Sequence, residues 1–381
     1  MKLTKRILAV LLAVVLSLGV VSCGESTQWI VKNGETTVPA GVYLAYLMNA
    51  YSEAVSQLED SNADVFKTQI DGKDASTWIK ETALQYVKEY VVIENLFSEM
   101  KLELEADQVS YAESYAQYIW SYYSEMYEQN GISYNSFYLT YLNGEKATAI
   151  FEAIYGEGGE KEVSKEDIEK YIAENVLRFK YISFDATDAE GNALAEGDEL
   201  NAIKATAEGY YERLKNGEGI DALADEYNAS LEEDTTSSEE TTSSEETTSS
   251  EETSSEEVTS EETTSETTSS EETTSEEDED ADRNVAVVAT NNTSLTEATI
   301  KAISDLAVGE QTLVKDTYQY LIVEGLNVLE DAETVEDYTS TARSELKGDE
   351  FEEYISTLAK DVEVELNQEA FDRYNPKKIK M

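Results

Sequence analysis

The sequence predicts an α+β protein, and three observations carry this prediction. Long segments before residue 160 and after residue 326 repeat apolar residues at helical spacing. The section between them contains short alternating runs rich in β-branched and aromatic residues, which is typical of strands. A tract of Ser, Thr and Glu with almost no apolar residue interrupts this middle section. We therefore expect a mostly helical region, a smaller region of helices and strands, and a helical C-terminal segment.

The helical region, residues 28–160, is expected to begin with a short strand and turn over Gln28–Val38, which contains the turn sequence Asn-Gly. Glycines at 156, 158 and 159 mark its end. Apolar periodicity and the flanking turn residues predict helices over Ala40–Leu58, Ser76–Glu105, Asp107–Gln129 and Ser133–Tyr155.

The middle region, residues 161–325, starts with a Ser-Lys-Glu-Asp sequence that is similar to a capping box. Its patterns predict helices over 164–174, Glu199–Lys215, 220–227 and Thr296–Leu306, and strands over Arg178–Phe184, Val285–Thr290 and Tyr318–Glu324. In the C-terminal segment, residues 326–381, we expect a helix over Thr334–Leu358 and a short β-like run over Val362–Leu366.

Residues 231–282 form the interrupting tract, built from Thr-Thr-Ser-Ser-Glu-Glu repeats. Between Glu232 and Asp282 it holds 22 acidic residues and no basic one. A segment with so few apolar residues cannot offset the entropy lost on ordering, so we expect a disordered, solvated insertion. A spacer, a weak cation-binding segment and a glycosylated tract are the functional alternatives.

The composition of the whole chain excludes several classes of site. Its 381 residues include 28 basic and 81 acidic side chains, which gives a net charge of −53, with one cysteine and no histidine. Nucleophilic triads that need His, intrachain disulfides and zinc sites built from His or Cys are therefore excluded. The negative charge argues against a nucleic-acid partner, because phosphate contacts require clustered Lys and Arg. We expect no cofactor and no bound metal.

Residues 1–22 are typical of an export signal. Three basic residues near the start precede the apolar stretch Ile7–Val21, which is too short for a comfortable membrane span. The stretch leads into Val-Val-Ser before Cys23, which resembles a bacterial lipobox, where the cysteine receives a diglyceride and becomes the first residue. Two acyl chains are enough for stable anchoring. We expect Cys23 to be lipidated, residues 23–27 to form a tether, and the protein to be held on the extracytoplasmic face of the cell membrane. An ordinary signal peptide or a buried cysteine is the alternative.

Several stretches resemble the PrsA/SurA-type parvulin foldases. VSKEDIEKYIAENVLRFKYISF is similar to the segment that leads into the first parvulin strand, NGEGIDALADEYNAS to a helix of that family, and LTEATIKAISDLAVGEQTLVKDTYQYLIVEGL to its last helix, turn and closing strands. WIVKNGETTVPAGVYLAYL and VEVELNQEAFDRYNPKK resemble the pieces that form the family's chaperone domain. The resemblance implies a helical chaperone domain built from residues 28–160 and 326–381, with a parvulin-like α/β domain, residues 161–325, inserted between them.

The resemblance also implies where a prolyl isomerase site would lie. The two histidine positions of the family match Tyr181 and Tyr320, and two proline-pocket positions match Ser294 and Ala298. A tyrosine hydroxyl forms hydrogen bonds but does not reproduce the donor and acceptor roles of an imidazole near neutral pH. We therefore expect weak or absent isomerase activity. An active site that works without histidine is one alternative, and two core aromatics on neighbouring strands are the other.

The predicted helix over Asp107–Gln129 is unusually rich in tyrosine. Tyr111, Tyr115, Tyr118 and Tyr122 share one helical face by their spacing. Such a stripe usually packs in a core. Hydroxylated rings in place of Leu and Ile instead suit a groove that binds unfolded segments loosely. Our candidate client-binding residues are Tyr115, Tyr118, Trp120, Tyr122 and Tyr123.

These features together predict a membrane-anchored chaperone or foldase outside the cytoplasm, with unfolded or nascent exported proteins as its partners. It would work by reversible burial of apolar client segments. An active peptidyl-prolyl isomerase is the first alternative. A structural or adhesive surface lipoprotein, with the acidic tract as a stalk, is the second, although the tract interrupts a domain where a stalk would separate a domain from its anchor.

Overall fold

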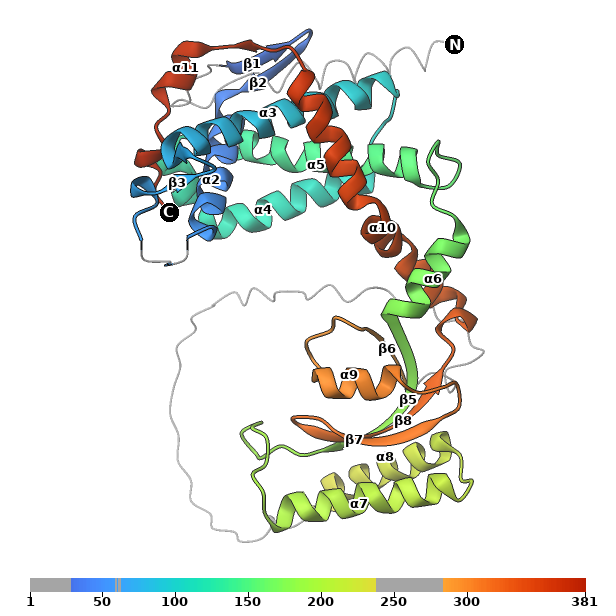
Figure 1. Cartoon of the computed structure of the whole chain (residues 1–381). Helices are drawn as coiled ribbons and strands as arrows, with labels where there is room; N and C mark the ends of the chain where they lie inside the picture. The colour runs from blue at the N-terminus through green and yellow to red at the C-terminus, as the bar shows by residue number, and fades with distance from the viewer. Residues whose placement is uncertain (1–28, 59, 61–62, 238–283) are drawn as a thin grey trace, which may run out of the picture. The chain divides into compact units, whose positions relative to one another are not determined.

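The computed structural model describes residues 29–58, 60, 63–237 and 284–381 (Figure 1). The predicted export signal, Cys23 and the predicted tether, and the part of the acidic tract after residue 237 lie outside the described residues. The chain divides into two compact units. Unit 1 comprises Met1–Ser164 and Arg343–Met381, and unit 2 comprises Lys165–Ala342.

Both units match the predicted α+β class. Unit 1 is mostly helical, whereas unit 2 packs helices on a four-stranded sheet. The α+β prediction is therefore confirmed.

A three-stranded sheet in unit 1 joins the two ends of the described chain. Strands β1 (Trp29–Asn33) and β2 (Thr36–Pro39) form an antiparallel hairpin whose turn includes Gly34 at φ +54°. The short strand β9 (Glu365–Leu366) pairs with the other edge of β1. The Asn367 side-chain amide donates a 2.9 Å hydrogen bond to the Trp29 carbonyl and fixes this pairing.

The helices of unit 1 enclose one apolar core. Val42, Leu47, Ile79, Val87 and Val91 are fully buried there, because α2 and α3 each place an apolar stripe toward the other helix. The helices of this unit are α2 (Ala40–Ser56), α3 (Ala75–Glu99), α4 (Ala106–Gln129), α5 (Tyr134–Tyr155), α11 (Gln368–Arg373) and the second half of α10 (Ala332–Asp361).

Two local features of unit 1 differ from the sequence prediction. Helix α3 ends at Glu99 and not at Glu105, because Lys101 adopts a left-handed φ of +56° that stops the helix. Between α2 and α3 the chain forms a 3-10 turn, η1 (Val65–Lys67). A short hairpin follows, in which each strand has two residues, β3 (Gln69–Ile70) and β4 (Lys73–Asp74). Asp71-Gly72 forms its turn with both residues at positive φ, which is a sequence signal for a hairpin, but the flanking strands are too short to show alternation.

Unit 2 is built on an antiparallel sheet with strand order β6-β5-β8-β7. Helices α7 and α8 cover one face, and α9 covers the other (Figure 1). The elements are α6 (Lys165–Asn175), β5 (Val176–Asp185), α7 (Asp198–Lys215), α8 (Ile220–Ser237), β6 (Val285–Ala289), α9 (Glu297–Ser304), β7 (Gln311–Lys315) and β8 (Gln319–Leu326).

Unit 2 extends farther along the chain than the predicted inserted region, 161–325. The 3-10 turn η2 (Val328–Glu330) and the start of α10 belong to it. The Arg178 guanidinium on β5 lies 3.2 Å from Asp331 and holds this segment to the sheet.

On the N-terminal side of the acidic tract, α8 continues through Ser237, so residues 231–237 are helical. The helix therefore extends past the predicted start of the acidic tract at residue 231. An established helix adds residues at low cost, since only its nucleation is unfavourable.

Candidate functional site

The two family-histidine positions, Tyr181 and Tyr320, lie on opposite faces of the sheet in unit 2. The register of β5 and β8 pairs Tyr320 with Phe184 and Tyr181 with Val323. Directly paired residues share a face and adjacent strand positions alternate, so Tyr320 shares the face of Phe184, whereas Tyr181 projects from the other face. Their surroundings agree with this: Tyr320 is buried in the cluster under α7 and α8, and Tyr181 packs beside Phe179 in the cluster under α9.

The two pocket positions do not complete a site either. Ser294 and Ala298 are both exposed, and the Ser294 backbone N–H donates to the Asn292 side chain at 2.7 Å. A hollow of about 160 Å³ on unit 2 is lined by other residues, among them Leu177, Ile303 and Val308. The structure thus does not bring the four isomerase positions together.

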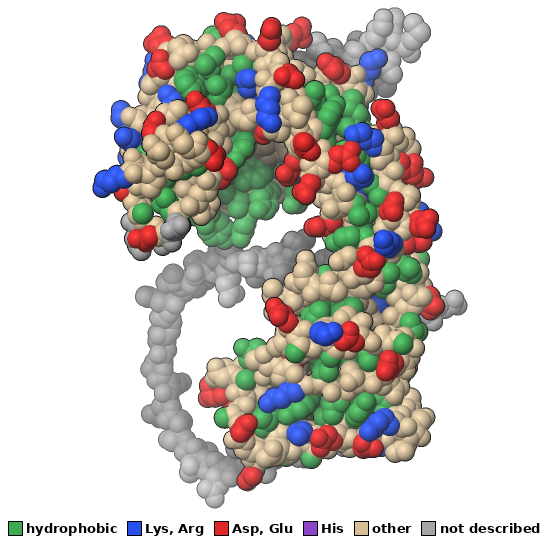
Figure 2. All heavy atoms as spheres, in the orientation of Figure 1, with side chains coloured by type: hydrophobic (Ala, Val, Ile, Leu, Met, Phe, Trp, Pro, Cys, Tyr) green, Lys and Arg blue, Asp and Glu red, His purple; other side chains and the backbone are tan. Residues whose placement is uncertain are grey.

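The tyrosines of α4 form a continuous exposed surface. We call Tyr111, Tyr115, Tyr118, Tyr122 and Tyr123 the tyrosine face; their exposed fractions run from 42% to 67%. In Figure 2, hydrophobic side chains gather along the edge of unit 1 at which Figure 1 places α4. The stripe that the spacing predicts is therefore on the surface, and its residues are not core aromatics.

Contacts between the rings hold the tyrosine face in place. Tyr111 stacks on Tyr115 at a centroid distance of 6.0 Å, and Tyr118 meets Tyr122 edge-to-face at 5.1 Å. Tyr115 also contacts Tyr141 of α5 at 5.3 Å. Such pairs stabilise a defined ring arrangement. The surface is therefore ordered before any partner arrives.

Trp120 differs from the other candidate residues because it packs inward. Its ring stacks on Tyr127 at 5.6 Å and meets Tyr134 and Phe137 at the same centroid distance. It belongs to the contacts that attach α4 to the unit 1 core, together with the buried Ala116. We therefore exclude Trp120 from the tyrosine face.

Local sequence explains why α4 forms and where it ends. Glu105 and Gln108 make a reciprocal capping box at its start, with the Glu105 N–H donating to the Gln108 side chain at 2.9 Å. At the other end, Gly131 adopts a φ of +80°, which terminates the helix and turns the chain into α5. Between these signals the tyrosine face stays exposed, and the Tyr115–Tyr141 ring contact links it to α5.

The surroundings of the tyrosine face are acidic. Helix α4 contains no Lys or Arg, and its four carboxylates form no ion pair with any described residue; they are Asp107, Glu113, Glu125 and Glu128. Burial, and then the Asp107 charge, raise the pKa of Glu145 on the neighbouring α5. Burial and the adjacent Tyr127 and Tyr115 raise the pKa of Tyr141 to about 12, so this hydroxyl stays protonated.

A shallow hollow of about 290 Å³ extends the tyrosine face at its C-terminal end. Its lining includes Tyr122, Tyr123, Met126 and Lys380. The Asn130 side chain fixes the chain end here, donating to the Lys380 carbonyl at 2.8 Å and accepting from its N–H at 3.0 Å.

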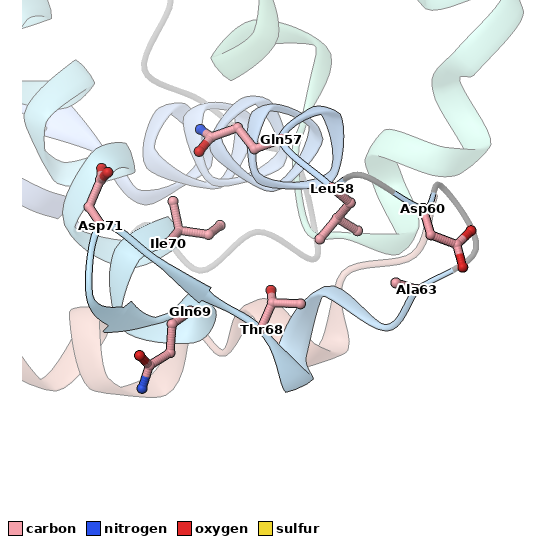
Figure 3. A pocket seen from close by; sticks show the side chains of 8 residues that line it. All are labelled: Gln57, Leu58, Asp60, Ala63, Thr68, Gln69, Ile70 and Asp71. Atoms are coloured by element: carbon pink, nitrogen blue, oxygen red, sulfur yellow. The ribbon is translucent and has the colours of Figure 1, made fainter.

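A second hollow, of about 450 Å³, lies between the end of α2 and the β3–β4 hairpin (Figure 3). One of its two carboxylates, Asp71, accepts a 3.0 Å hydrogen bond from the Trp78 indole. Its other lining side chains are amides, a hydroxyl and small or aliphatic groups, which offer no nucleophile with a base beside it. We assign no chemistry to it.

Within the part of the chain that the structure describes, no group of three or more Asp, Glu, Cys or His side chains is placed to hold a metal ion. Across the same residues, no helix combines the length and apolar character needed to span a membrane.

Comparison with known proteins gives structural matches only. No protein-family model matches the chain, and no curated protein sequence matches it. A foldase protein PrsA structure from Streptococcus pneumoniae matches with a TM-score of 0.37 and 11% identity, covering 90% of this chain and 97% of that one. The Lactococcus lactis PrsA foldase matches with a TM-score of 0.34 and 12% identity over 90% and 96% of the two chains. The PrsA structure from Bacillus subtilis matches with a TM-score of 0.30 and 17% identity over 81% and 98%.

The resemblance to PrsA foldases noted in the sequence is thus also found when structures are compared. At these identities and TM-scores we transfer no site residue from those structures to this chain.

Proposed function

We propose that this protein is a chaperone of the foldase kind, which binds unfolded segments of exported proteins outside the cytoplasm. The observation that carries the proposal is the tyrosine face, in which five exposed rings of α4 are ordered by contacts with one another and with Tyr141 of α5. Monomeric proteins rarely expose a contiguous apolar patch without using it for binding.

The strength of such a surface suits reversible binding. A tyrosine ring offers apolar area together with a hydroxyl that stays hydrated, so a client segment is held without losing all contact with water. If three rings each contribute about 1 to 1.5 kcal/mol, the total is about 3 to 4.5 kcal/mol, which corresponds to dissociation constants of about 0.5 to 6 mM for one segment. A client with several such segments is retained, and a folded client that buries them is released.

We propose further that unit 2 is not an efficient prolyl isomerase. Rotation about the prolyl bond faces a barrier of about 18 to 20 kcal/mol, and lowering it requires groups that converge on one amide. The opposite orientation of Tyr181 and Tyr320 and the exposure of Ser294 and Ala298 support a non-catalytic unit. Among the described residues, nothing specifically favours the isomerase alternative.

Suppression of client aggregation tests the chaperone proposal. With thermally unfolded citrate synthase, the full chain is expected to reduce light scattering in proportion to its concentration. The variant Tyr118→Ser/Tyr122→Ser/Tyr123→Ser should lose most of this effect. The matched control is Tyr318→Ser, because Tyr318 is 52% exposed in unit 2 and its loss removes an equivalent ring elsewhere. Equal suppression by the triple variant, or none by the wild-type chain, contradicts the proposal.

A proline-limited refolding assay tests the non-catalytic status of unit 2. We expect no acceleration of the slow phase. Acceleration that disappears in a Tyr181→Phe/Tyr320→Phe double variant would instead favour the isomerase alternative.

We also propose that Cys23 carries the membrane anchor, on the basis of its place at the end of the apolar stretch. In a bacterial host, the wild-type chain should then fractionate with membranes, and Cys23→Ser should release it. Unchanged fractionation of Cys23→Ser contradicts the anchor.

A further inference from the structure

We propose that the N-terminal half of the tyrosine face binds extended client segments in which Lys or Arg alternates with apolar residues. This inference rests on the proposed chaperone function and names the class of segment that the same surface selects. The cation would lie over the rings of Tyr111, Tyr115 and Tyr141 and between the carboxylates of Asp107 and Glu145.

The length of the surface fits a short extended segment. Tyr111 and Tyr122 are eleven residues apart on α4, and at 1.5 Å per residue the row is about 16 Å long. An extended chain rises about 3.3 Å per residue, so about five client residues lie along the row.

The charges place the cation at one end of the row. Asp107 lies one helical turn before Tyr111, and Glu145 lies one turn after Tyr141 on α5, so both carboxylates flank the rings that meet at Tyr115. Neither forms an ion pair with a described residue.

Nearby cations do not neutralise this end. Lys146 is held by Glu94 at 2.6 Å and is only 20% exposed. Lys380 lines the hollow beside Tyr122 and Tyr123, at the opposite end of the row. The two unpaired acids therefore favour an incoming cation where Tyr111 and Tyr115 stack, whereas the hollow at the opposite end contains Lys380 beside its one acid, Glu125.

The Asp107–Glu145 pair is also electrostatically unfavourable as it stands. Burial is the main cause that raises the pKa of Glu145, and the like charge of Asp107 adds to it. A positive side chain placed between two like charges removes their repulsion and gains attraction to both.

Two places in this chain already combine a tyrosine ring and a carboxylate with a cation. Lys161 lies 5.7 Å from the Tyr155 ring centroid and 2.8 Å from a Glu350 oxygen. In unit 2, Arg213 lies 5.3 Å from the Tyr210 ring centroid and 2.6 Å from a Glu226 oxygen.

Each of these internal examples combines a tyrosine ring, a carboxylate and a cation. The surface around Tyr111, Tyr115, Asp107 and Glu145 supplies the rings and the carboxylates but no cation. A cation held by both a ring and a carboxylate gains from each, which is the chemistry that we expect a client Lys or Arg to use.

Three capped peptides that differ only in charge test the inference. Their five-residue cores are Leu-Lys-Leu-Lys-Leu, Leu-Gln-Leu-Gln-Leu and Leu-Glu-Leu-Glu-Leu, each joined to the same uncharged fluorophore. Anisotropy titration with the full chain at low salt should give a dissociation constant about fivefold to tenfold lower for the Lys peptide than for the Gln peptide. The Glu peptide should bind more weakly than both. In 1 M NaCl, where charges are screened beyond about 3 Å, the advantage of the Lys peptide should fall below about twofold.

Two matched variants locate the effect. Asp107→Asn/Glu145→Gln should remove most of the Lys advantage and leave Gln-peptide binding unchanged. Glu174→Gln/Asp225→Asn alters the net charge by the same amount at exposed acids of unit 2 and should change nothing. Circular dichroism and tryptophan fluorescence check that each variant is folded.

The outcomes separate the inference from the chaperone proposal. Equal binding of the three peptides by a chain that suppresses aggregation overturns the charge selection and leaves the chaperone function standing. A Lys advantage that survives in Asp107→Asn/Glu145→Gln, or disappears equally in Glu174→Gln/Asp225→Asn, overturns the location. Absence of both peptide binding and aggregation suppression overturns the inference together with the proposed function.

Discussion

Tyrosines have opposite environments in α4 and in the sheet of unit 2. On α4, Tyr122 is 67% exposed and contacts other exposed rings. In unit 2, Tyr320 is 6% exposed, and Tyr210 and Tyr227 pack against the buried Phe184 at centroid distances of 5.7 and 4.5 Å. The residue type is the same, but in unit 2 these rings stabilise a core, whereas on α4 they remain available to a partner.

The difference comes from what covers each element. Strand β5 has helices on both sides of its sheet, so no ring on it is left without a packing partner. Helix α4 attaches to unit 1 through a narrow side that includes Ala112, Ala116 and Trp120, and its other side faces outward. Whether a tyrosine ring is buried in a core or available for binding therefore depends on whether another helix or strand packs over its own element.

The largest expected effect on stability comes from removing a ring that is buried in the core of unit 2. Phe184→Ala leaves a cavity between Tyr210, Tyr227 and Tyr320 and should destabilise unit 2 by about 3 to 5 kcal/mol. Hydrogen exchange of the β5 and β8 amides measures this loss. Aggregation suppression should persist under conditions in which unit 2 remains folded.

The three tryptophans supply an internal control, because Trp29, Trp78 and Trp120 all lie in unit 1. Their fluorescence transition in urea should not move in Phe184→Ala. If the tryptophan transition lost as much stability as the sheet amides, the two units would not unfold separately. The contrast between the tyrosines of α4 and those of unit 2 would then not hold.

A smaller loss of stability is expected from Trp120→Ala. This substitution measures how much the inward side of α4 contributes to the stability of unit 1. The substitution removes the contacts with Tyr127, Tyr134 and Phe137 and should destabilise unit 1 by about 3 kcal/mol. The remaining tryptophans report the urea transition. A change below about 0.5 kcal/mol would show that α4 does not depend on its inward side.

An intermediate effect with a defined pH dependence is expected at Asp316, which is buried in unit 2. Burial alone would raise its pKa, but hydrogen bonds from Thr299, Thr296 and Thr317 together lower the pKa below its ordinary value. A carboxyl with a lowered folded-state pKa stabilises the fold above its unfolded pKa of about 3.9, and this contribution is lost as the pH falls through the folded-state pKa.

Asp316→Asn should therefore cost about 1 to 3 kcal/mol in unit 2 at pH 7. The difference from the wild type should shrink below about pH 4. Amide exchange of β7 and β8 at pH 7 and pH 3 provides the measurement. A difference that grows on acidification contradicts the role of the ionised carboxylate.

The smallest stability effect is expected on the exposed side, at Tyr122→Ala. Because Tyr122 is 67% exposed and its ring contacts are with the exposed Tyr118 and Tyr123, its loss should change the free energy of unfolding of unit 1 by less than about 0.5 kcal/mol. Aggregation suppression, in contrast, should fall measurably. A loss above about 2 kcal/mol would place Tyr122 among the structural aromatics and break the contrast with Trp120.

Sequence periodicity predicted most of the fold because long amphipathic helices and alternating strands leave strong patterns. The patterns failed where a single backbone conformation decided the result. Nothing in Lys-Leu-Glu-Leu-Glu after Met100 opposes a helix, yet the left-handed Lys101 ends α3. The two-residue strands β3 and β4 were missed because alternation needs more residues to be visible.

The candidate site was predictable in part for a similar reason. Helical spacing places Tyr111, Tyr115, Tyr118 and Tyr122 on one face, but it does not show whether another element covers that face. The separation of Tyr181 from Tyr320 depends on strand register, since a shift of one residue would place both rings on the same face. These strands are separated in sequence by the acidic tract, and no local pattern fixes their register.

The pairing of β9 with β1 has a consequence for the timing of folding. The Asn367 side chain donates a hydrogen bond to the Trp29 carbonyl across 338 residues, so a growing chain displays an open β1 edge until β9 has been made. Unit 2 lies wholly between these two strands and is complete earlier. The chaperone that we propose therefore exposes an unpaired strand edge of its own while unit 2 and β9 are being made, and aggregation through the edge of β1 is the risk during that interval.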